Sequence, residues 1–327
     1  MAEYGIPYMG SKGAIAKEVI KILPKADHFY DLFGGGFSIT HAMLRHRSKD
    51  YKHFHFNEIR PGICELIRDA IAGKYSYQNF KPPFVDRETF FKNKDICAYT
   101  KMCWSFGNNG KDYLFSKEIE PYKKSMHNAI IFNEFDGLAK EVLKMQSFKD
   151  GYSVKDRRFF LRQTIETYRK TDIPKVLHKF LSEKQLKQLK QLERLQQLKQ
   201  LERLQQLQQL EQLEQLQQLE RLQQLERLNF YTGSYDKVDI KPNSVIYCDP
   251  PYANTASYDG DFNHKQFLNW AAEHNTPIFI SEYDIPDKRF YLVKKIKKRS
   301  MLSPNQDNLL IKTEKIYMNK AALKLVS

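Results

Sequence analysis

Short hydrophobic runs and amphipathic stretches alternate along the first part of the chain. One mostly hydrophobic run ends in three consecutive glycines, and a stretch with helical periodicity follows them. A second short run precedes a stretch that Pro61 opens and Gly73 ends, as is typical of a helix. The expected order is a strand at 28–33, a glycine turn at 34–36, a helix at 38–47, a strand at 53–56 and a helix at 61–72. This order predicts a parallel sheet with right-handed crossovers.

The same alternation returns in the last third of the chain. Strands are expected at 229–232, 244–248 and 277–280, a helix at 262–274, and a closing antiparallel pair at 290–293 and 309–318. The middle of the chain is rich in Lys, Arg and aromatic residues and lacks period-two alternation, so we expect a mostly helical insertion. The predicted organisation is an α/β sheet domain in two parts, 1–74 and 229–327, separated by a helical domain at 75–183 and a low-complexity repeat at 184–228.

The low-complexity segment is a leucine repeat. From Leu186 to Leu228 a leucine stands at every third position, with Gln, Glu, Lys and Arg between. Three residues advance an α-helix by about 300°, so the leucines circle a straight helix and form no single seam, unlike a coiled-coil heptad. The residue types favour helix over a β-solenoid. Two interpretations stay open: a helical arm that binds a second copy or wraps around the insertion, and a tandem expansion that the neighbouring domain tolerates.

Charge points to a class of partner. The formal net charge is +14, and residues 184–228 contribute only +2 of it, from 8 basic and 6 acidic residues. Such a surplus indicates a polyanion such as nucleic acid, although a generally basic protein has the same composition. The four cysteines form no C-x-x-C pair and no zinc spacing, which predicts reduced thiols and no metal site. No apolar run approaches the ~18 residues of a membrane helix, and no signal peptide is evident. The chain is therefore expected in the cytoplasm, without a membrane partner.

The glycine turn is the first candidate for chemistry. Asp31 and Phe33 precede Gly34 and Gly36, which allow a backbone to approach a ligand closely at the start of a helix. No G-x-G-x-x-G or P-loop sequence occurs, so neither a nicotinamide nor a triphosphate is indicated. The residues suit S-adenosylmethionine, whose amine Asp31 would bind. Glu58 stands 22 residues after Gly36, where an acidic residue binds ribose hydroxyls in doubly wound sheets. A structural glycine turn and a surface glutamate are the alternatives.

The second candidate is the sequence Asp249-Pro250-Pro251-Tyr252, directly after the strand at 244–248. Two prolines stop the strand and fix the backbone, so the Asp249 carboxylate and the Pro250 carbonyl become two oriented acceptors. Such a pair suits the exocyclic amine of a base, because gripping both hydrogens turns the nitrogen lone pair toward a methyl donor. Tyr252 offers a face for base stacking, and a base in duplex DNA has to be flipped out to reach it. An ordinary strand-ending turn is the alternative.

Together these motifs resemble the Dam-like DNA adenine-N6 methyltransferases. Residues 8–12, 31–37, 57–58, 249–252 and 280–283 resemble the family's motifs in the family's order. The resemblance implies a Rossmann-like, S-adenosylmethionine-dependent methyltransferase sheet, with cofactor-binding roles for Tyr8 and Lys12 and a target-recognition domain in the middle. It implies a bacterial or phage-encoded enzyme that methylates a flipped-out adenine in duplex DNA. The chain departs from the family at Glu58, where Asp is usual, and in its leucine repeat.

Basic and amide side chains are the candidates for DNA contact. Asn108, Asn109 and Lys111 lie in a Gly- and Asn-rich loop of the insertion, and an amide can pair with adenine. A second, basic cluster suits phosphate contact: Lys294, Lys295, Lys297, Lys298 and Arg299.

Several alternatives stay open. Asp236 either contacts the cofactor's adenine or caps a turn. An RNA adenine or cytosine-N4 methyltransferase is one other function, although Asp249 in place of Ser argues against cytosine. A non-catalytic DNA-binding or scaffold protein is another, against which the intact Asp249 and Tyr252 argue.

Overall fold

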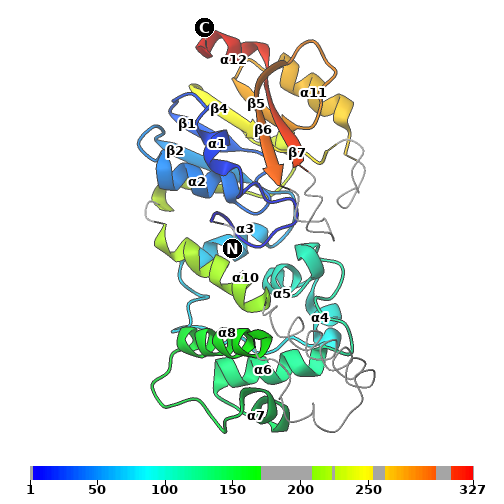
Figure 1. Ribbon diagram of the computed structural model, residues 1–327. Helices are drawn as coiled ribbons and strands as arrows, with labels where there is room; N and C mark the ends of the chain where they lie inside the picture. The colour runs from blue at the N-terminus through cyan, green and yellow to red at the C-terminus, as the bar shows by residue number, and fades with distance from the viewer. Residues whose placement is uncertain (1–2, 171–207, 223–224, 253–261, 300–310, 327) are drawn as a thin grey trace, which may run out of the picture.

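The computed structural model describes residues 3–170, 208–222, 225–252, 262–299 and 311–326, and its main element is a seven-stranded sheet (Figure 1). The strand order is β3-β2-β1-β4-β5-β7-β6. The first five strands in this order are parallel neighbours, and β7 runs antiparallel to both β5 and β6. The strands are β1 (His28–Asp31), β2 (His53–Asn57), β3 (Leu228–Tyr231), β4 (Ser244–Cys248), β5 (Ile278–Glu282), β6 (Tyr291–Arg299) and β7 (Ile311–Met318). The predicted strands are thus confirmed to within a few residues, except that β6 is longer than expected.

The hydrophobic strands form the middle layer between two cores. Successive side chains of a strand point to opposite faces, and in β4 Val245 and Tyr247 enter one core whereas Ile246 and Cys248 enter the other. Helices α2 (Ser38–His46) and α3 (Ile63–Ile71) supply the first core, and α11 (His264–Glu273) supplies the second. Continuous hydrophobic strands are what a parallel sheet covered on both faces requires. Two shorter helices, α1 (Ala16–Ile20) and α12 (Lys320–Val326), complete this part.

The described elements between residues 75 and 170 are helical, as expected for the insertion. They are α4 (Arg87–Asn93), α5 (Ala98–Cys103), the 3-10 turn η1 (Phe106–Asn108), α6 (Glu120–Phe132), α7 (Gly137–Leu143) and α8 (Val154–Lys170). They form the lower half of the molecule in Figure 1. Helices α6, α7 and α8 share a separate core that includes Met126, Ile130, Phe148 and Leu161, whereas Phe90 of α4 and Met102 of α5 belong to the same core as the sheet. None of the described helices is long and apolar enough to cross a membrane.

The end of the leucine repeat joins these two halves. Residues 208–222 form α10 (Gln208–Gln217) and the 3-10 turn η3 (Gln218–Arg221), and α10 lies between the sheet and the lower helices in Figure 1. Leu210 is buried in the core of the insertion, whereas Leu213, Leu216 and Leu219 are buried in the core of the sheet domain. Leucines that circle a helix can fill two cores on different sides of it. The leucines of residues 208–222 are therefore buried without forming a single row along one side of the helix.

The rest of the repeat is only partly accounted for. Residues 186–207, on which most of the predicted arm falls, lie outside the described residues, so self-association stays a prediction. A further 3-10 turn, η4 (Leu225–Arg227), follows, and Leu228, the last leucine, is already the first residue of β3. The predicted boundary at 228 therefore cuts into the sheet by one residue.

Candidate active site

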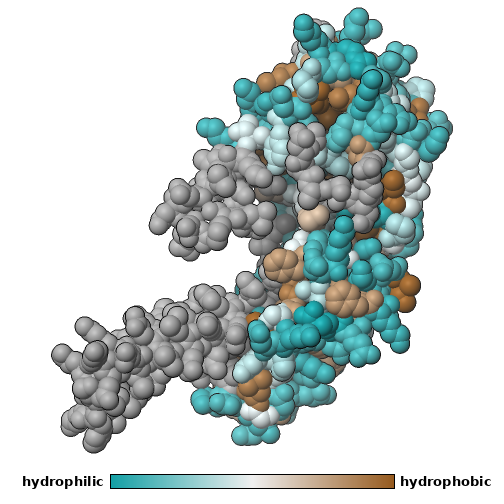
Figure 2. Space-filling view, turned by 90° about the vertical axis from the view of Figure 1, so that its right-hand side faces the viewer, coloured by the Kyte–Doolittle hydropathy of each residue, from teal (hydrophilic) through white to brown (hydrophobic). Residues whose placement is uncertain are grey.

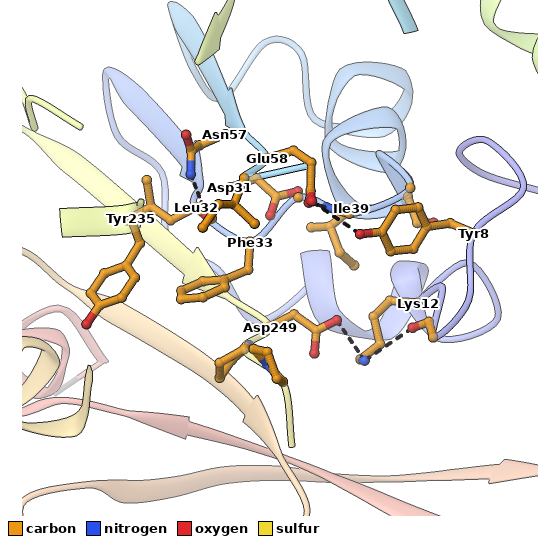
Figure 3. A pocket seen from close by; sticks show the side chains of 18 of the residues that line it. Tyr8, Lys12, Asp31, Leu32, Phe33, Ile39, Asn57, Glu58, Tyr235 and Asp249 are labelled. Carbon is orange, nitrogen blue, oxygen red and sulfur yellow. Dashed lines mark hydrogen bonds and ion pairs between the residues drawn. The ribbon is translucent and has the colours of Figure 1, made fainter. Parts of the chain in front are cut away.

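A pocket of about 520 Å³ opens at the carboxyl ends of the parallel strands (Figure 3). Its walls come from the glycine turn after β1, Asn57 and Glu58 at the end of β2, and residues 249–252 after β4. Because β1 pairs with β2 on one side and β4 on the other, the crevice lies where connections leave the sheet in opposite directions. The N-terminal residues 8–12 and Glu314 of β7 close it. Two motifs more than two hundred residues apart in the sequence thus meet at one edge of the sheet.

Packing explains the glycines of the turn. A Cβ atom on Gly34 would lie 2.0 Å from the Phe56 ring, and one on Gly36 would lie 2.5 Å from the Tyr8 Cβ. Gly35 has a φ of 50° and donates its N–H to Glu58 at 2.8 Å. Gly34 and Gly36 are thus required by neighbouring side chains, which shape the pocket wall. All three glycines also line the pocket, so the expected access of a ligand to their backbone stays a prediction.

Asp31 presents an unpaired acceptor in this pocket. Its side chain is buried, and Thr40 of α2 donates a hydrogen bond to Oδ2 at 2.8 Å. Among the described residues, Oδ1 has no hydrogen-bond partner. Burial raises the pKa of the Asp31 carboxyl to about 7, although the Thr40 hydrogen bond opposes this. A buried carboxylate with an open oxygen suits a cationic donor such as an ammonium group.

Most hydrogen-bond acceptor sites of the Glu58 carboxylate are occupied by donors of the protein itself. Its carboxylate accepts hydrogen bonds from the N–H groups of Gly35 and Arg60, at 2.8 and 3.0 Å, and from the Tyr8 hydroxyl at 3.3 Å. A carboxylate offers about four acceptor sites, so roughly one stays available for a ribose hydroxyl unless Tyr8 moves. Burial raises the pKa of Glu58, and these donors oppose the shift. The predicted ribose contact is therefore possible at one hydroxyl.

Lys12 lies against the Asp249 segment. Its Nζ is 2.7 Å from Asp249 Oδ2 (Figure 3). The same Nζ is 4.7 Å from the centre of the Tyr252 ring. Burial disfavours the ammonium, but Asp249 and Glu314 outweigh it and raise the pKa of Lys12. Tyr252 also packs edge-on against Tyr283, with ring centres 4.6 Å apart. The predicted catalytic residues are thus assembled around a buried cation.

The pocket is acidic although the whole chain is basic. Four carboxylates line it (Asp31, Glu58, Asp249 and Glu314) against two cations, Lys12 and Arg60, which gives a formal charge of −2. The chain as a whole carries +14. Low-dielectric walls strengthen such a local field. The pocket therefore disfavours phosphates and favours a ligand with a net positive charge.

Aromatic side chains form another wall. Phe33 stacks on Tyr235 with ring centres 5.2 Å apart, and both residues line the pocket. Asn57 donates hydrogen bonds to the carbonyls of Leu32 and Gly233, at 2.9 and 3.0 Å, and so ties β2 to the loop that carries Tyr235. The flat wall and its fixed backbone suit a planar heterocycle.

The predicted DNA-contact residues lie elsewhere. The Asn109 carbonyl oxygen accepts the N–H groups of Lys111 and Asp112, its amide donates to the Asp112 carboxylate, and the Asn108 amide donates to the Met102 carbonyl. Both amides therefore hold their own turn. The basic cluster lies in the edge strand β6, where Lys294 forms an ion pair with Glu18 at 2.7 Å and Lys295 and Lys297 are exposed. Lys298 and Arg299 belong to the same strand.

Three pocket features were not found from the sequence. Thr40 supports Asp31, Tyr235 stacks on Phe33, and Glu314 faces Lys12. Glu314 could have been found as a charged residue inside a predicted strand, whereas no local sequence pattern distinguishes Thr40. Asp236 accepts a hydrogen bond from Ser234 and is not among the residues that line the pocket, which supports the turn-capping interpretation. Among the described residues, no group of three or more His, Cys, Asp or Glu is placed to hold a metal ion.

Comparisons with known proteins give a family. A model described as D12 class N6 adenine-specific DNA methyltransferase matches residues 8–276. No curated protein matches the chain. Among solved structures, the chain is similar to the rRNA methyltransferase aviRa from Streptomyces viridochromogenes, with 11% identity, a TM-score of 0.35, and 98% of this chain and 89% of that chain covered. A likeness this weak carries no argument, whereas the family match spans most of the chain and both predicted motifs.

Proposed function

Because this chain belongs to the D12 class of N6 adenine-specific DNA methyltransferases, we propose that its pocket binds S-adenosylmethionine beside the target adenine. The reaction is methylation of the adenine N6 amine in DNA, and the RNA, cytosine-N4 and scaffold alternatives are not favoured. The observation that carries the pocket assignment is the convergence of the Asp31 turn and the Asp249 segment in one acidic cavity.

The residues present fit the cofactor. S-adenosylmethionine carries an ammonium, a sulfonium and a carboxylate, so its net charge of about +1 complements the acidic pocket. The open Oδ1 of Asp31 is the acceptor for the ammonium, and Glu58 is the acceptor for a ribose hydroxyl. The Phe33–Tyr235 wall is the place for the adenine ring of the cofactor. When bound, the cofactor supplies an electrophilic methyl group on its sulfonium.

The chain's own residues then prepare the substrate amine. The Asp249 carboxylate and the Pro250 carbonyl accept hydrogen bonds from its two N–H groups, which draws the nitrogen lone pair out of the ring and directs it at the methyl group. The methylated nitrogen then releases one of these protons to solvent. Tyr252 stacks on the flipped base and offsets part of the unstacking cost, at roughly 1–3 kcal/mol per base. The rate then comes from positioning and electrostatics, without a covalent intermediate on the protein.

We also propose how duplex DNA is held. Lys295 and Lys297 on β6 are exposed and available for phosphate contact. The face seen in Figure 2 is largely hydrophilic, with small separate hydrophobic patches. Ile59, which is exposed, is also among the residues that line the pocket. Asn108 and Asn109 stay candidates for base readout, for which they would exchange the hydrogen bonds that hold their turn.

The experiment follows the labelled methyl group. Wild-type protein is given methyl-labelled S-adenosylmethionine and unmethylated bacterial DNA, the DNA is digested to nucleosides, and the labelled nucleoside is identified by mass. Label in N6-methyladenine is expected. Asp249→Ala is expected to lower the rate of methyl transfer by about 10²- to 10³-fold. Asp236→Ala is the matched control, because it removes an acidic residue outside the pocket. Label in cytosine, or in RNA alone, would overturn the substrate assignment.

A further inference from the structure

Glu314 is a buried carboxylate in the active site to which no motif assigns a role. It lies in the middle of β7, its side chain is 4% exposed, and it lines the pocket. Its Oε1 is 3.6 Å from Lys12 Nζ. Within the described ranges, this oxygen has no partner at hydrogen-bond distance.

The sheet itself does not require a charge at this position. Strand pairing uses backbone groups, and the residue opposite Glu314 on β6 is the hydrophobic Ile296. Burying a carboxylate that is incompletely hydrogen-bonded destabilises the fold. A carboxylate kept inside a pocket at such a cost indicates a part in the chemistry of the site.

Lys12 is shared between two carboxylates. Its Nζ is 2.7 Å from Asp249 Oδ2 and 3.6 Å from Glu314 Oε1. Lys12 occupies an acceptor site on Asp249, the same carboxylate that the adenine amine has to reach. A charge-assisted hydrogen bond is about 2.8 Å long, so 3.6 Å minus 2.8 Å leaves a movement of only about 0.8 Å for Lys12 to reach Glu314.

We propose that Glu314 is a positioning residue for methyl transfer: it shares Lys12 with Asp249 and takes over the ammonium when the adenine amine binds Asp249. This inference rests on the proposed function of the Asp249 segment. Lys12 then stays close enough to keep Asp249 ionised while an acceptor site opens for the amine. The charged and titratable groups around Glu314 are Lys12, Asp249 and Tyr247 of β4.

The test replaces Glu314 with Gln, which keeps the shape and one acceptor but removes the charge. We expect the Kd of S-adenosylmethionine to change less than threefold, because Asp31 and Glu58 are intact. We expect the single-turnover rate of methyl transfer to fall by about 10- to 100-fold, as is typical of a misplaced reacting group. The Tm should stay the same or rise, since a buried charge is lost, and Glu314→Asp should recover part of the rate.

Asp50→Asn is the matched control. Asp50 is a carboxylate whose side chain is 19% exposed, it forms an ion pair with Arg47 at 2.7 Å, and it is not among the residues that line the pocket. Its substitution should leave the transfer rate within threefold of wild type. Equal transfer rates for Glu314→Gln and wild type would overturn the proposal, and so would equal losses in Glu314→Gln and Asp50→Asn.

A second readout does not depend on turnover. Reaction of Lys12 with an amine-acylating reagent, followed by mass spectrometry, should be several-fold faster in Glu314→Gln because one stabilising carboxylate is gone. An unchanged Lys12 reactivity would also overturn the role of Glu314. If wild-type protein transfers no methyl group to DNA, the proposed function fails, and the reactivity of Lys12 still decides the role of Glu314.

Discussion

Cofactor binding is expected to weaken as the pH falls through 7, because Asp31 has to be ionised to hold an ammonium group. Burial raises the pKa of its carboxyl to about 7 in the free protein. A bound ammonium lowers that pKa, so the affinity is present above pH 7 and is lost below it. The protonation penalty on Kd is a factor of 1 + 10^(7 − pH), which is about 11 at pH 6.0 and about 1.3 at pH 7.5. Kd is therefore expected to rise about eightfold between these values.

Isothermal titration calorimetry of S-adenosylmethionine at pH 6.0, 6.5, 7.0 and 7.5 measures this change. The window stops at pH 7.5 because an α-amine loses its proton near pH 7.7–8.0. Asp31→Asn should bind more weakly at every pH, by about 2–5 kcal/mol for a lost buried partner, and should show no pH dependence from this group. Glu314→Gln is the control, because burial raises the pKa of Glu314 to about 7 as well. A constant Kd in wild-type protein, or an eightfold change that persists in Asp31→Asn, would refute the reasoning.

Two further predictions concern stability. Leu216→Ala should lower the free energy of unfolding by about 2–5 kcal/mol, because Leu216 is fully buried in the sheet-domain core. Urea unfolding measures this loss, with Gln218→Ala as the control. Equal losses of stability in both variants would contradict the prediction. The protein should also lose stability as the pH falls from about 6.5 toward 4. Burial, with the nearby His28 and His53, lowers the pKa of His55 to about 4. Because the unfolded chain binds more protons than the folded chain in this pH range, acid favours unfolding. His55 accounts for at most about 3 kcal/mol of this loss. A His55→Phe variant keeps the ring stacked on Tyr30 and should lack this part of the loss. Identical curves of unfolding free energy against pH for the variant and wild type would rule out the role of His55.

Much of the fold was predictable because its signals are local. Strands β4 and β5 carry consecutive hydrophobic residues, 245–248 and 278–280, as is typical of a parallel strand with cores on both faces. The glycine turn and the Asp-Pro-Pro-Tyr segment are short and depend on backbone chemistry that only Gly and Pro provide. Both motifs, with Tyr8, Asp31 and Glu58, do line one pocket.

Which partners the predicted site residues have could not be read from the sequence. Lys12 was expected on the cofactor; it lines the pocket, and its ammonium lies between Asp249 and Glu314. Asn108 and Asn109 were expected to read bases, which stays a prediction, and their amides form hydrogen bonds with neighbouring backbone groups and Asp112. The composition of a loop shows which hydrogen bonds are possible and leaves open which partners are nearer.

The leucine repeat shows the same division. The sequence determined that leucines spaced by three circle a helix, which follows from helical geometry alone. Only the tertiary structure decided that Leu210 and Leu216 fill different cores, because that requires two hydrophobic surfaces on different sides of one helix. Likewise, periodicity and turn chemistry predicted which strands form and where they end to within a few residues, except for β6. The order in which strands from both ends of the chain pair is set by long-range packing, and this order is what brings Asp31, Asp249 and Glu314 into one pocket.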